Sequence, residues 1–413
     1  MLKKEIYLDY AASTPIDSRV LSVVKKTEKK FWKNPSSLHS GGVEAFKYLN
    51  SLRTGIAEVL FAHSDEIFFT SGGTESNNLA IRGVLKSFEN KSASVLVSAI
   101  DHSSIIETVK SLDKKIKVVF LPVTETGKIS TEFLKKELLK KPTLLSFGYV
   151  NGEIGTVQDV REIMKMVRHH RKVNKTATPY VHIDATQAAN VFSCEVHKLG
   201  IDLMTLDGSK IYGPKGVGML FIRRGVPVAP IVYGGGQEQG KRSGTENLPA
   251  ISGFYEALRL AQKDKEKNFK SLKSLQSNFI KSVLSKIPQS ALNGPVEVGE
   301  KPDYAYRHPG IASFCFAGAD AEQAVLILDS FGIAVSPSSS CQNLAERSNS
   351  YVVEALSHSS TGNKSGGNAK DKCALSSIRF SFGKFSKISD LKYVVKCLKK
   401  AVDDSKGKKI TLL

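Results

Sequence analysis

Short runs of apolar residues alternate with amphipathic segments along the first two thirds of the chain. The apolar runs predict buried strands at 67–70, 94–98, 117–120, 144–147, 181–184, 203–206 and 218–222. Between most of them, apolar residues recur at helical spacing, for example at 75–86, 103–111, 130–140 and 159–172. This alternation predicts an α/β fold with a mostly parallel sheet flanked by helices. In such sheets ligands bind beyond the carboxyl ends of the strands.

The hydrophobic pattern changes after about residue 260. A long lysine-rich amphipathic helix is predicted over 263–286, because its apolar residues repeat at helical spacing. Shorter units follow, with strands at 311–316 and 377–382 and helices at 320–331 and 389–404. These elements predict a second, smaller α/β domain at the C-terminal end. We expect a large domain over 15–260 and a small domain formed by 1–14 together with 261–413.

Two stretches of the predicted small domain read as loops. Residues 357–372 are rich in Gly and Ser and lack periodicity, which is typical of a mobile surface loop. Residues 336–350 begin with the small residues Ser336-Pro337-Ser338-Ser339-Ser340 and contain Cys341. The second loop therefore places a thiol outside the regular secondary structure.

The composition is that of a folded protein with a large positive charge. Hydrophobic residues make up 41% of the 413 positions, which is enough for a sizeable core. The formal net charge is +19, from 59 basic and 40 acidic residues. The lysines are spread along amphipathic helices, which indicates solvated helix faces, and no nucleic-acid-binding fingerprint accompanies them. We expect no nucleic acid partner, whereas acidic protein partners are compatible with the charge.

The sequence predicts no contact with a membrane. No apolar run approaches the ~20 residues that a membrane helix needs. The first residues lead into a strand-like Ile6-Tyr7-Leu8 rather than into the apolar core of a signal peptide. A cytoplasmic location is the expectation.

The chain has five cysteines: Cys194, Cys315, Cys341, Cys373 and Cys397. They are odd in number, widely spaced and never arranged as CxxC, which argues against a disulfide framework and against a zinc site. Each is expected to be a small core residue or an isolated thiol. The surroundings of Cys341 suggest a further role for this thiol.

Three motifs carry candidate chemistry. The turn Ser71-Gly72-Gly73-Thr74 joins a strand to a helix, and the N–H groups at the helix start suit a phosphate. Asp184 ends another strand, where its carboxylate can hold a protonated ring nitrogen. Lys210 follows a third strand in a glycine-flanked turn, where its amine can form a Schiff base with an aldehyde cofactor. Each motif taken alone has an ordinary structural explanation: the glycine turn can be purely structural, Asp184 can cap a helix, and Lys210 can be a surface lysine. Together the three motifs suit the binding of pyridoxal phosphate (PLP).

With these motifs the chain resembles cysteine desulfurases of the NifS/IscS type, in the class-V aminotransferase family with PLP fold type I. The matching stretches cover nearly the whole chain, at 7–12, 34–39, 70–78, 101–102, 150–155, 184–187, 210–216, 234–247 and 377–382. The resemblance implies a homodimer that converts L-cysteine to L-alanine. It also implies a sulfur-acceptor protein that serves iron–sulfur cluster assembly or tRNA thiolation.

The resemblance implies a cofactor role for particular residues. Lys210 would form the Schiff base, Asp184 would pair with the ring nitrogen, and His102 would stack on the ring and move protons. Gln187 would donate a hydrogen bond to the phenolic oxygen. The other residues implied to bind PLP are Gly73, Thr74, Asn151 and Ser209, with Thr245 reaching the phosphate bound to the partner subunit.

The substrate and its sulfur have their own implied residues. Arg379 and Asn34 would bind the substrate carboxylate, Arg379 through the planar fork of its guanidinium. Cys341 would be the catalytic nucleophile that takes up the sulfur as a persulfide, in a loop before a helix that contains Tyr351. The length of this loop resembles the IscS/NifS branch rather than the SufS branch.

The chain departs from the family pattern near the implied phosphate site. The usual Ser-Gly-His-Lys is Asp207-Gly208-Ser209-Lys210, so an acid stands where a hydrogen-bond donor is expected. Two like charges about 4 Å apart cost about 4 kcal/mol at an effective dielectric constant of 20, or roughly three orders of magnitude in affinity. Either Asp207 turns away, or a cation such as Arg242 compensates, or PLP binds weakly.

Two further departures concern neighbouring motifs. The usual Val-Asn-Asn-Glu is Val150-Asn151-Gly152-Glu153, so the side chain of the second Asn is missing. The usual Gly-Ser-Ala-Cys is Ser338-Ser339-Ser340-Cys341, followed by Gln342-Asn343 instead of small residues.

Two alternative functions stay open from the sequence. One is another class-V activity, such as selenocysteine lyase; a plain aminotransferase would not need Cys341. The other is a degenerate homologue with impaired PLP binding that acts as a binding scaffold for acidic partners or RNA. Strongly salt-dependent RNA binding without cofactor would favour the scaffold.

Overall fold

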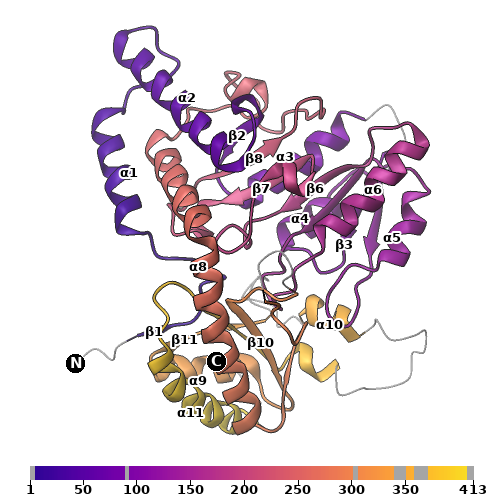
Figure 1. Ribbon diagram of the computed structural model, residues 1–413, viewed down its shortest axis with the longest axis vertical. Coiled ribbons are helices and arrows are strands. Elements are labelled where there is room, and N and C mark those ends of the chain that lie inside the picture. Colours follow the sequence, from indigo (N-terminus) through magenta and orange to yellow (C-terminus); the bar gives the residue numbers. More distant parts are fainter. Residues whose placement is uncertain (1–4, 89–92, 301–305, 339–349, 358–370, 407–413) are drawn as a thin grey trace.

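The computed structural model describes residues 5–88, 93–300, 306–338, 350–357 and 371–406. In Figure 1 a helix-covered sheet forms the upper part and a smaller sheet with its helices forms the lower part. The helix α8 (Leu248–Lys286) runs from one part to the other. Cys341 and residues 358–370 of the expected surface loop lie outside the described residues.

The upper sheet contains all the strands that the apolar runs predict. Their order is β2 (Ile67–Thr70), β8 (Gly218–Ile222), β7 (Leu203–Asp207), β6 (Tyr180–Asp184), β5 (Leu144–Gly148), β3 (Ser94–Ser98) and β4 (Lys117–Leu121). The pairs from β7 to β4 are parallel, and β8 is antiparallel to both of its neighbours. The predicted α/β fold with a mostly parallel sheet is thus confirmed.

Helices cover both faces of this sheet, so its inner strands are buried on both sides and read as continuous apolar runs. The helices of this part are α1 (Ser18–Lys30), α2 (Ser40–Leu60), α3 (Gly73–Lys86), α4 (Ser103–Lys110), α5 (Thr131–Leu138), α6 (Val160–Asn174) and α7 (Val196–Leu199). Single 3₁₀ turns lie at η1 (Ser64–Glu66), η2 (Gly208–Lys210) and η3 (Glu238–Gly240). The turn η2 follows β7 and carries Lys210, so the sheet fixes the position of the Lys210 backbone.

The long helix α8 packs against α1 and α2 at one end and against α11 (Ile388–Asp404) at the other. It begins earlier than predicted, with Asn247 as its N-cap accepting a hydrogen bond from the Ala250 amide. The apolar stripe of its second half is buried as expected: Phe269, Leu272, Leu275, Phe279 and Val283. Because α8 crosses position 260, the division into two domains there stays a prediction. None of the described helices is long and apolar enough to cross a membrane.

The lower part is built on an antiparallel sheet. Its strand order is β12 (Ser336–Pro337), β13 (Ser377–Ser381), β10 (Ile311–Phe316) and β9 (Ser290–Leu292). The N-terminal strand β1 (Ile6–Tyr7) pairs in parallel with β11 (Ile333–Ala334), so the start of the chain lies beside these C-terminal elements. The helices here are α9 (Ala321–Ser330), α10 (Tyr351–Ser357) and α11, with a 3₁₀ turn η5 (Asp371–Ala374).

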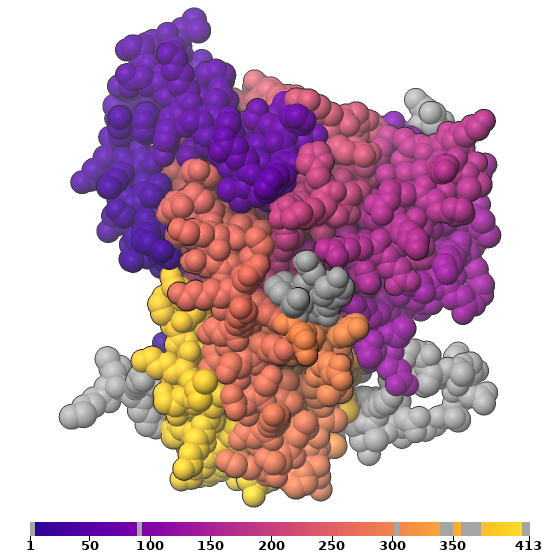
Figure 2. Space-filling view, viewed as in Figure 1, coloured from indigo at the N-terminus to yellow at the C-terminus, as the bar shows by residue number. Residues whose placement is uncertain are grey.

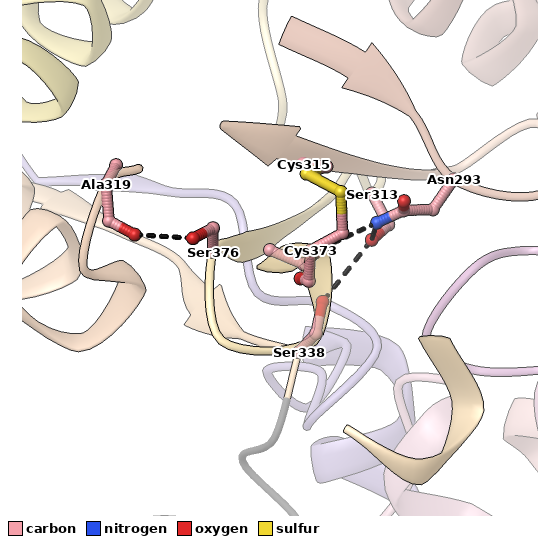
Figure 3. Close-up of a disulfide and its surroundings, with 8 residues drawn as sticks. Asn293, Ser313, Cys315, Ala319, Ser338, Cys373 and Ser376 are labelled. Atoms are coloured by element: carbon pink, nitrogen blue, oxygen red, sulfur yellow. Dashed lines mark hydrogen bonds between the residues drawn. A yellow bond between two sulfur atoms is a disulfide. The ribbon is translucent and has the colours of Figure 1, made fainter. Parts of the chain in front are cut away.

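Cys315 and Cys373 form a disulfide between β10 and η5 (Figure 3). The prediction of isolated cysteines is therefore wrong for this pair, which is 58 residues apart in the sequence. The physical reason is the pairing of β10 with β13, which sets Cys315 opposite Ser377 and so brings the preceding η5 close. Cys194 and Cys397 are unpaired and buried, as expected for small core residues.

This disulfide predicts a thiol count. The denatured, non-reduced protein should have three reactive thiols, five cysteines less the two that are paired, and five after reduction. Disulfides do not persist under reducing conditions, so the protein should be purified without reductant before the thiols are counted. Thiol titration and a non-reducing peptide map measure this, with Cys373→Ser as the control that gives the same count before and after reduction. Five thiols before reduction would contradict the disulfide.

Candidate active site

A cavity of about 450 Å³ lies at the carboxyl ends of β3, β5, β6 and β7. This is where the sheet topology predicts a ligand site. Residues of the lower part close it from the opposite side, among them Ser336, Ser338 and Arg379. The cavity therefore draws its walls from segments that are far apart in the sequence.

The cavity brings together most of the residues singled out from the sequence. Its lining includes Gly73, Thr74, His102, Asn151, Asp184, Gln187, Lys210 and Arg379. Asn34, Ser209 and Thr245 do not line it in this single chain, and Cys341 lies outside the described residues. The individual roles given to these residues stay predictions.

Asp184 is held at the end of β6 by two hydrogen bonds. Asn77 donates from Nδ2 to Oδ2 at 2.8 Å, and the Thr186 amide donates to Oδ1 at 3.0 Å. Asp184 is buried, yet it lines the cavity. A buried carboxylate fixed in this way suits a protonated ring nitrogen, whose charge would offset the cost of its burial. Asn77 was missed from the sequence because it lies within the first turns of α3.

Lys210 sits in η2, directly after β7. The turn is anchored by Thr14, whose amide donates to the Ser209 carbonyl at 2.9 Å, and by Asn190, whose Nδ2 donates to the Lys210 carbonyl at 2.6 Å. The amine Nζ donates to the carbonyl of Ala12. The backbone of Lys210 is thus fixed, while its long side chain places an amine in the cavity.

His102 caps α4 and lines the same cavity. Its Nδ1 accepts a hydrogen bond from the Ser104 amide at 3.2 Å and lies 2.8 Å from the Ser104 hydroxyl. Because Nδ1 accepts the amide hydrogen, the neutral ring carries its proton on Nε2. This arrangement fixes both the ring orientation and the atom that can exchange a proton.

Asp101 is a second buried carboxylate beside this group, which the sequence analysis did not single out. Burial raises its pKa to about 8, with the nearby Asp184 charge acting in the same direction. The amides of Gly148 and Ser98 donate to it at 2.7 and 3.0 Å and oppose that rise. The raised pKa means that burial disfavours the charged form of the Asp101 carboxyl.

The turn after β5 carries Asn151 and Gly152. Asn151 Oδ1 accepts the amides of Glu153 and Ile154 at 2.9 Å, and its Nδ2 donates to the Ile100 carbonyl at 2.8 Å, so its polar atoms hold the turn itself. A Cβ on Gly152 would lie 3.3 Å from Gln187 Nε2. A side chain at position 152, where the family pattern has its second Asn, would therefore lie beside Gln187. The Gln187 Nε2 donates to the Ala11 carbonyl at 2.8 Å.

Arg379 projects from β13 and is almost fully buried. Its Nη2 donates to Asp9 Oδ1 at 2.8 Å, and its Nη1 donates to the Gly152 carbonyl at 3.1 Å. Its Nε is buried and has no hydrogen-bond partner among the described residues. A buried guanidinium with unused donor capacity, at the wall of a cavity, suits a carboxylate ligand.

The phosphate end of the cavity is shaped by Asp207. The amide of Gly73, at the start of α3, donates to Asp207 Oδ2 at 2.7 Å. Both the amide and the hydroxyl of Ser209 donate to Asp207 Oδ1 at 2.7 Å. The Ser209 hydroxyl therefore binds Asp207 instead of lining the cavity. Of the three possibilities drawn from the sequence, the turning away of Asp207 is wrong.

Arg242 forms its ion pair with Glu75 and does not offset the negative charge of Asp207. Its Nε lies 2.8 Å from Glu75 Oε1, and this pair is largely buried. Glu75 Oε2 in turn accepts the Ser71 amide at 2.8 Å. The guanidinium is thus committed to Glu75, and the suggestion of compensation by Arg242 is wrong as well.

PLP fits the ring end of this cavity. A lysine amine, a buried carboxylate, a histidine and an amide side chain lie around one space, as Lys210, Asp184, His102 and Gln187 do. At the other end Thr74 and the start of α3 suit a phosphate, but the Gly73 amide there is engaged by Asp207.

Asn34 and Thr245 lie elsewhere on the molecule. Asn34 precedes α2 and accepts the Ser36 amide at 2.8 Å. Thr245 is exposed in the loop before α8. Their implied roles at the cavity stay predictions.

Comparison with known proteins places the chain among relatives with a shared description. The family profile described as Aminotransferase class-V matches residues 6–394. The chain is 36% identical over 403 residues to a cysteine desulfurase IscS of Dictyoglomus turgidum, covering 97% of this chain and 95% of that one.

Solved structures give the same result. The chain is similar to a NifS-like protein with a TM-score of 0.84 and 29% identity, covering 97% of this chain and 100% of that one. It is also similar to SspA in complex with cysteine, with a TM-score of 0.73 and 26% identity, covering 92% and 100%. These matches extend over both parts of the structure.

Proposed function

Because the chain belongs to the class-V aminotransferase family, we propose that it is a PLP-dependent cysteine desulfurase, which converts L-cysteine to L-alanine and transfers the sulfur to Cys341. One observation carries this proposal. A single cavity gathers Lys210 and Asp184 from the ends of two parallel strands and faces them with Arg379 from the other sheet. An amine, a buried carboxylate and a guanidinium so placed suit an aldehyde cofactor with an amino acid substrate.

The residues divide the chemistry between them. When bound, PLP supplies an aldehyde that joins to an amine and a protonated ring that withdraws electrons from the substrate Cα. Asp184 keeps the ring nitrogen protonated, because its fixed carboxylate favours the charged form. Lys210 Nζ removes the proton from the substrate Cα, and His102 Nε2 donates or accepts a proton nearby.

Arg379 orients the substrate. Its guanidinium can bind the substrate carboxylate through two donors while Asp9 and the Gly152 carbonyl hold its remaining N–H groups. This contact would orient the amino acid with its Cα towards Lys210, which lines the same cavity.

Replacement of Arg379 by lysine should raise KM for L-cysteine and lower kcat/KM about 10- to 100-fold. Lysine keeps the charge beside Asp9 but loses the fork, so one charge-assisted hydrogen bond to the carboxylate is lost. Steady-state kinetics of alanine formation measure the effect. Arg224→Lys is the control, since Arg224 pairs with Asp65 on the surface. An unchanged KM would show that Arg379 does not bind the substrate.

The proposed role of Cys341 rests on the described residues on either side of it. Ser338 and Ser350 both line the cavity. Cys341 is three positions beyond Ser338, so its Cα can be no more than about 11 Å from that of Ser338. The far side is tied down by Ser350, which donates to Glu153 Oε1, and by the Tyr351 hydroxyl, which donates to the Asp101 carbonyl at 2.6 Å.

The sulfur step balances without a further reactant. The Cys341 thiolate attacks the substrate sulfur and forms an S–S bond. The bond between the substrate sulfur and Cβ breaks, and its electron pair stays on the carbon, which a proton then converts to the methyl group of L-alanine. The outer sulfur of the Cys341 persulfide is then transferred to a nucleophile of an acceptor protein, and the Cys341 thiolate leaves. For this protein type the acceptor serves iron–sulfur cluster assembly or tRNA thiolation.

We further propose that the protein is a homodimer. The loop that ends in Thr245 is pinned to β2, because Glu238 accepts the Phe69 amide at 2.8 Å and pairs with Arg53, yet Thr245 itself is exposed. Helices α1 and α2 form the indigo region of Figure 2. Three large apolar residues in or beside them, Trp32, Leu38 and Phe46, are 70%, 97% and 52% exposed. Such a surface suits a second copy of the chain.

Sedimentation should therefore give about twice the chain mass of 45.0 kDa. Replacing Leu38 and Phe46 by serine should shift the protein towards the monomer, since both side chains lie at the surface proposed as the interface. A monomeric wild type at micromolar concentration would contradict the dimer.

The function is tested by the products. Purified protein with PLP, L-cysteine and a thiol reductant should release L-alanine and sulfide in equal amounts, over many turnovers. Alanine is measured by amino acid analysis and sulfide by a colorimetric assay. Absence of alanine from a folded, PLP-loaded protein would contradict the proposed function.

A further inference from the structure

Two acidic side chains meet backbone amides where α3 begins. Asp207 Oδ2 accepts the Gly73 amide, and Glu75 Oε2 accepts the Ser71 amide. Amides at a helix start are the groups that bind phosphate in many proteins. The two carboxylates differ in their surroundings, because Glu75 is paired with Arg242, whereas the described hydrogen bonds to Asp207 come from uncharged donors, Gly73 and Ser209.

The sheet register fixes Asp207 at this place. Gly218 on β8 pairs with Thr70 on β2 and with Asp207 on β7. A Cβ on Gly218 would lie 2.7 Å from Gly72 Cα, so the glycine lets the 71–73 turn approach closely. Asp207 therefore ends its strand next to the turn, and its short side chain reaches the Gly73 amide.

The Asp207 carboxylate is held from both of its oxygens. Oδ1 accepts the amide and the hydroxyl of Ser209, which belong to its own turn, and Oδ2 points to Gly73. A phosphate that competes for the Gly73 amide would break only the bond to Oδ2. The carboxylate would still be kept beside the phosphate by Ser209.

We propose that Asp207 is an internal anion of the phosphate cradle, which makes this chain discriminate weakly between PLP and unphosphorylated pyridoxal. The inference rests on the proposed function, since it takes the cavity to be a PLP site. The two cofactors share the ring and the aldehyde, so Lys210, Asp184 and His102 treat them alike. They differ at the Asp207 end, where PLP carries an anion and pyridoxal carries a hydroxyl that can donate to the carboxylate.

The test compares two dissociation constants in one protein. Full-length protein stripped of cofactor is titrated separately with PLP and with pyridoxal, followed by absorption. Asp207→Asn keeps the shape and removes the charge, so PLP should bind about 5- to 10³-fold more tightly, the range that like charges about 4 Å apart produce between aqueous and protein-like dielectric constants. Pyridoxal affinity should stay the same or fall by no more than about tenfold, because the amide oxygen of Asn still accepts the hydroxyl hydrogen but without the charge.

A matched control removes a charge elsewhere. Asp65→Asn changes the net charge by the same amount, and Asp65 pairs with Arg224 on the surface, so the ratio of the two constants should stay as in the wild type. Asp207→Ser is a second variant in case the Asn side chain disturbs the turn. Because both constants come from the same sample, their ratio does not depend on the fraction of folded protein.

The outcomes separate the inference from the proposed function. If the wild type binds PLP through Lys210 and the Asp207 variants leave the ratio unchanged, the inference is overturned and the enzyme remains. If the folded wild type binds neither compound, both are overturned. A rise of the PLP preference in both Asp207 variants, with none in Asp65→Asn, supports the inference.

Discussion

Replacement of Lys210 by alanine is expected to lower the release of L-alanine from L-cysteine by at least about 10³-fold. Lys210 is the amine that the turn after β7 holds in the cavity, and the loss removes both the covalent link to the cofactor and the base that moves the substrate proton. Turnover is measured with saturating PLP, so that weaker cofactor binding does not account for the result.

A second readout identifies the lysine directly. Borohydride reduction of the PLP-loaded protein followed by peptide mass analysis should find the cofactor on Lys210. Lys215→Ala is the matched control, because Lys215 is exposed a few residues beyond the same turn and should retain both activity and label. Label on another lysine, or turnover by the Lys210 variant near the wild-type rate, would remove Lys210 from the mechanism.

Replacement of Cys341 by alanine is expected to abolish turnover to a similar extent, at least about 10³-fold, while PLP still binds. The cavity with Lys210, Asp184 and Arg379 does not depend on this thiol, so cofactor and substrate should still bind. The step that is lost is the attack on the substrate sulfur. Mass analysis of the wild type after brief exposure to L-cysteine should find one additional sulfur, on the Cys341 peptide, and none in the variant.

The control for the thiol is Cys397→Ala, which removes a buried free cysteine on α11. It should keep its persulfide on Cys341 and most of its activity. A Cys341→Ala protein that turns over L-cysteine at the wild-type rate would show that the sulfur leaves without this residue, and the desulfurase would then need another acceptor.

The strands of the large sheet could be predicted because their signal is local. Strands such as β5 and β6 are buried on both faces, so their apolar runs stand out from the helices around them. The start of α8 was missed for the opposite reason. Between Leu248 and Ala261 the helix buries side chains on several faces, which leaves little contrast between an apolar and a polar side.

The residues of the candidate site likewise fall into those with a local sequence signal and those brought together only by the fold. Gly73, Asp184 and Lys210 could be found because each lies at the end of a strand or shortly after it, and the ends of parallel strands meet at one edge of the sheet. The part played by Asp9 could not be predicted, because Asp9 pairs with Arg379, which is 370 positions away in the sequence. The disulfide was missed because strand pairing, and not spacing, brings Cys373 to Cys315. The orientation of Asp207 required the register of β2, β8 and β7.

The most direct test of the account is a visible absorption spectrum of the purified protein, taken before and after addition of PLP and then of L-cysteine. The wild type is expected to form a visible absorption band with PLP, which is absent in Lys210→Ala and changes when L-cysteine is added. No such band in a folded wild type with excess PLP would contradict the central claim that this cavity is a PLP site for cysteine desulfuration.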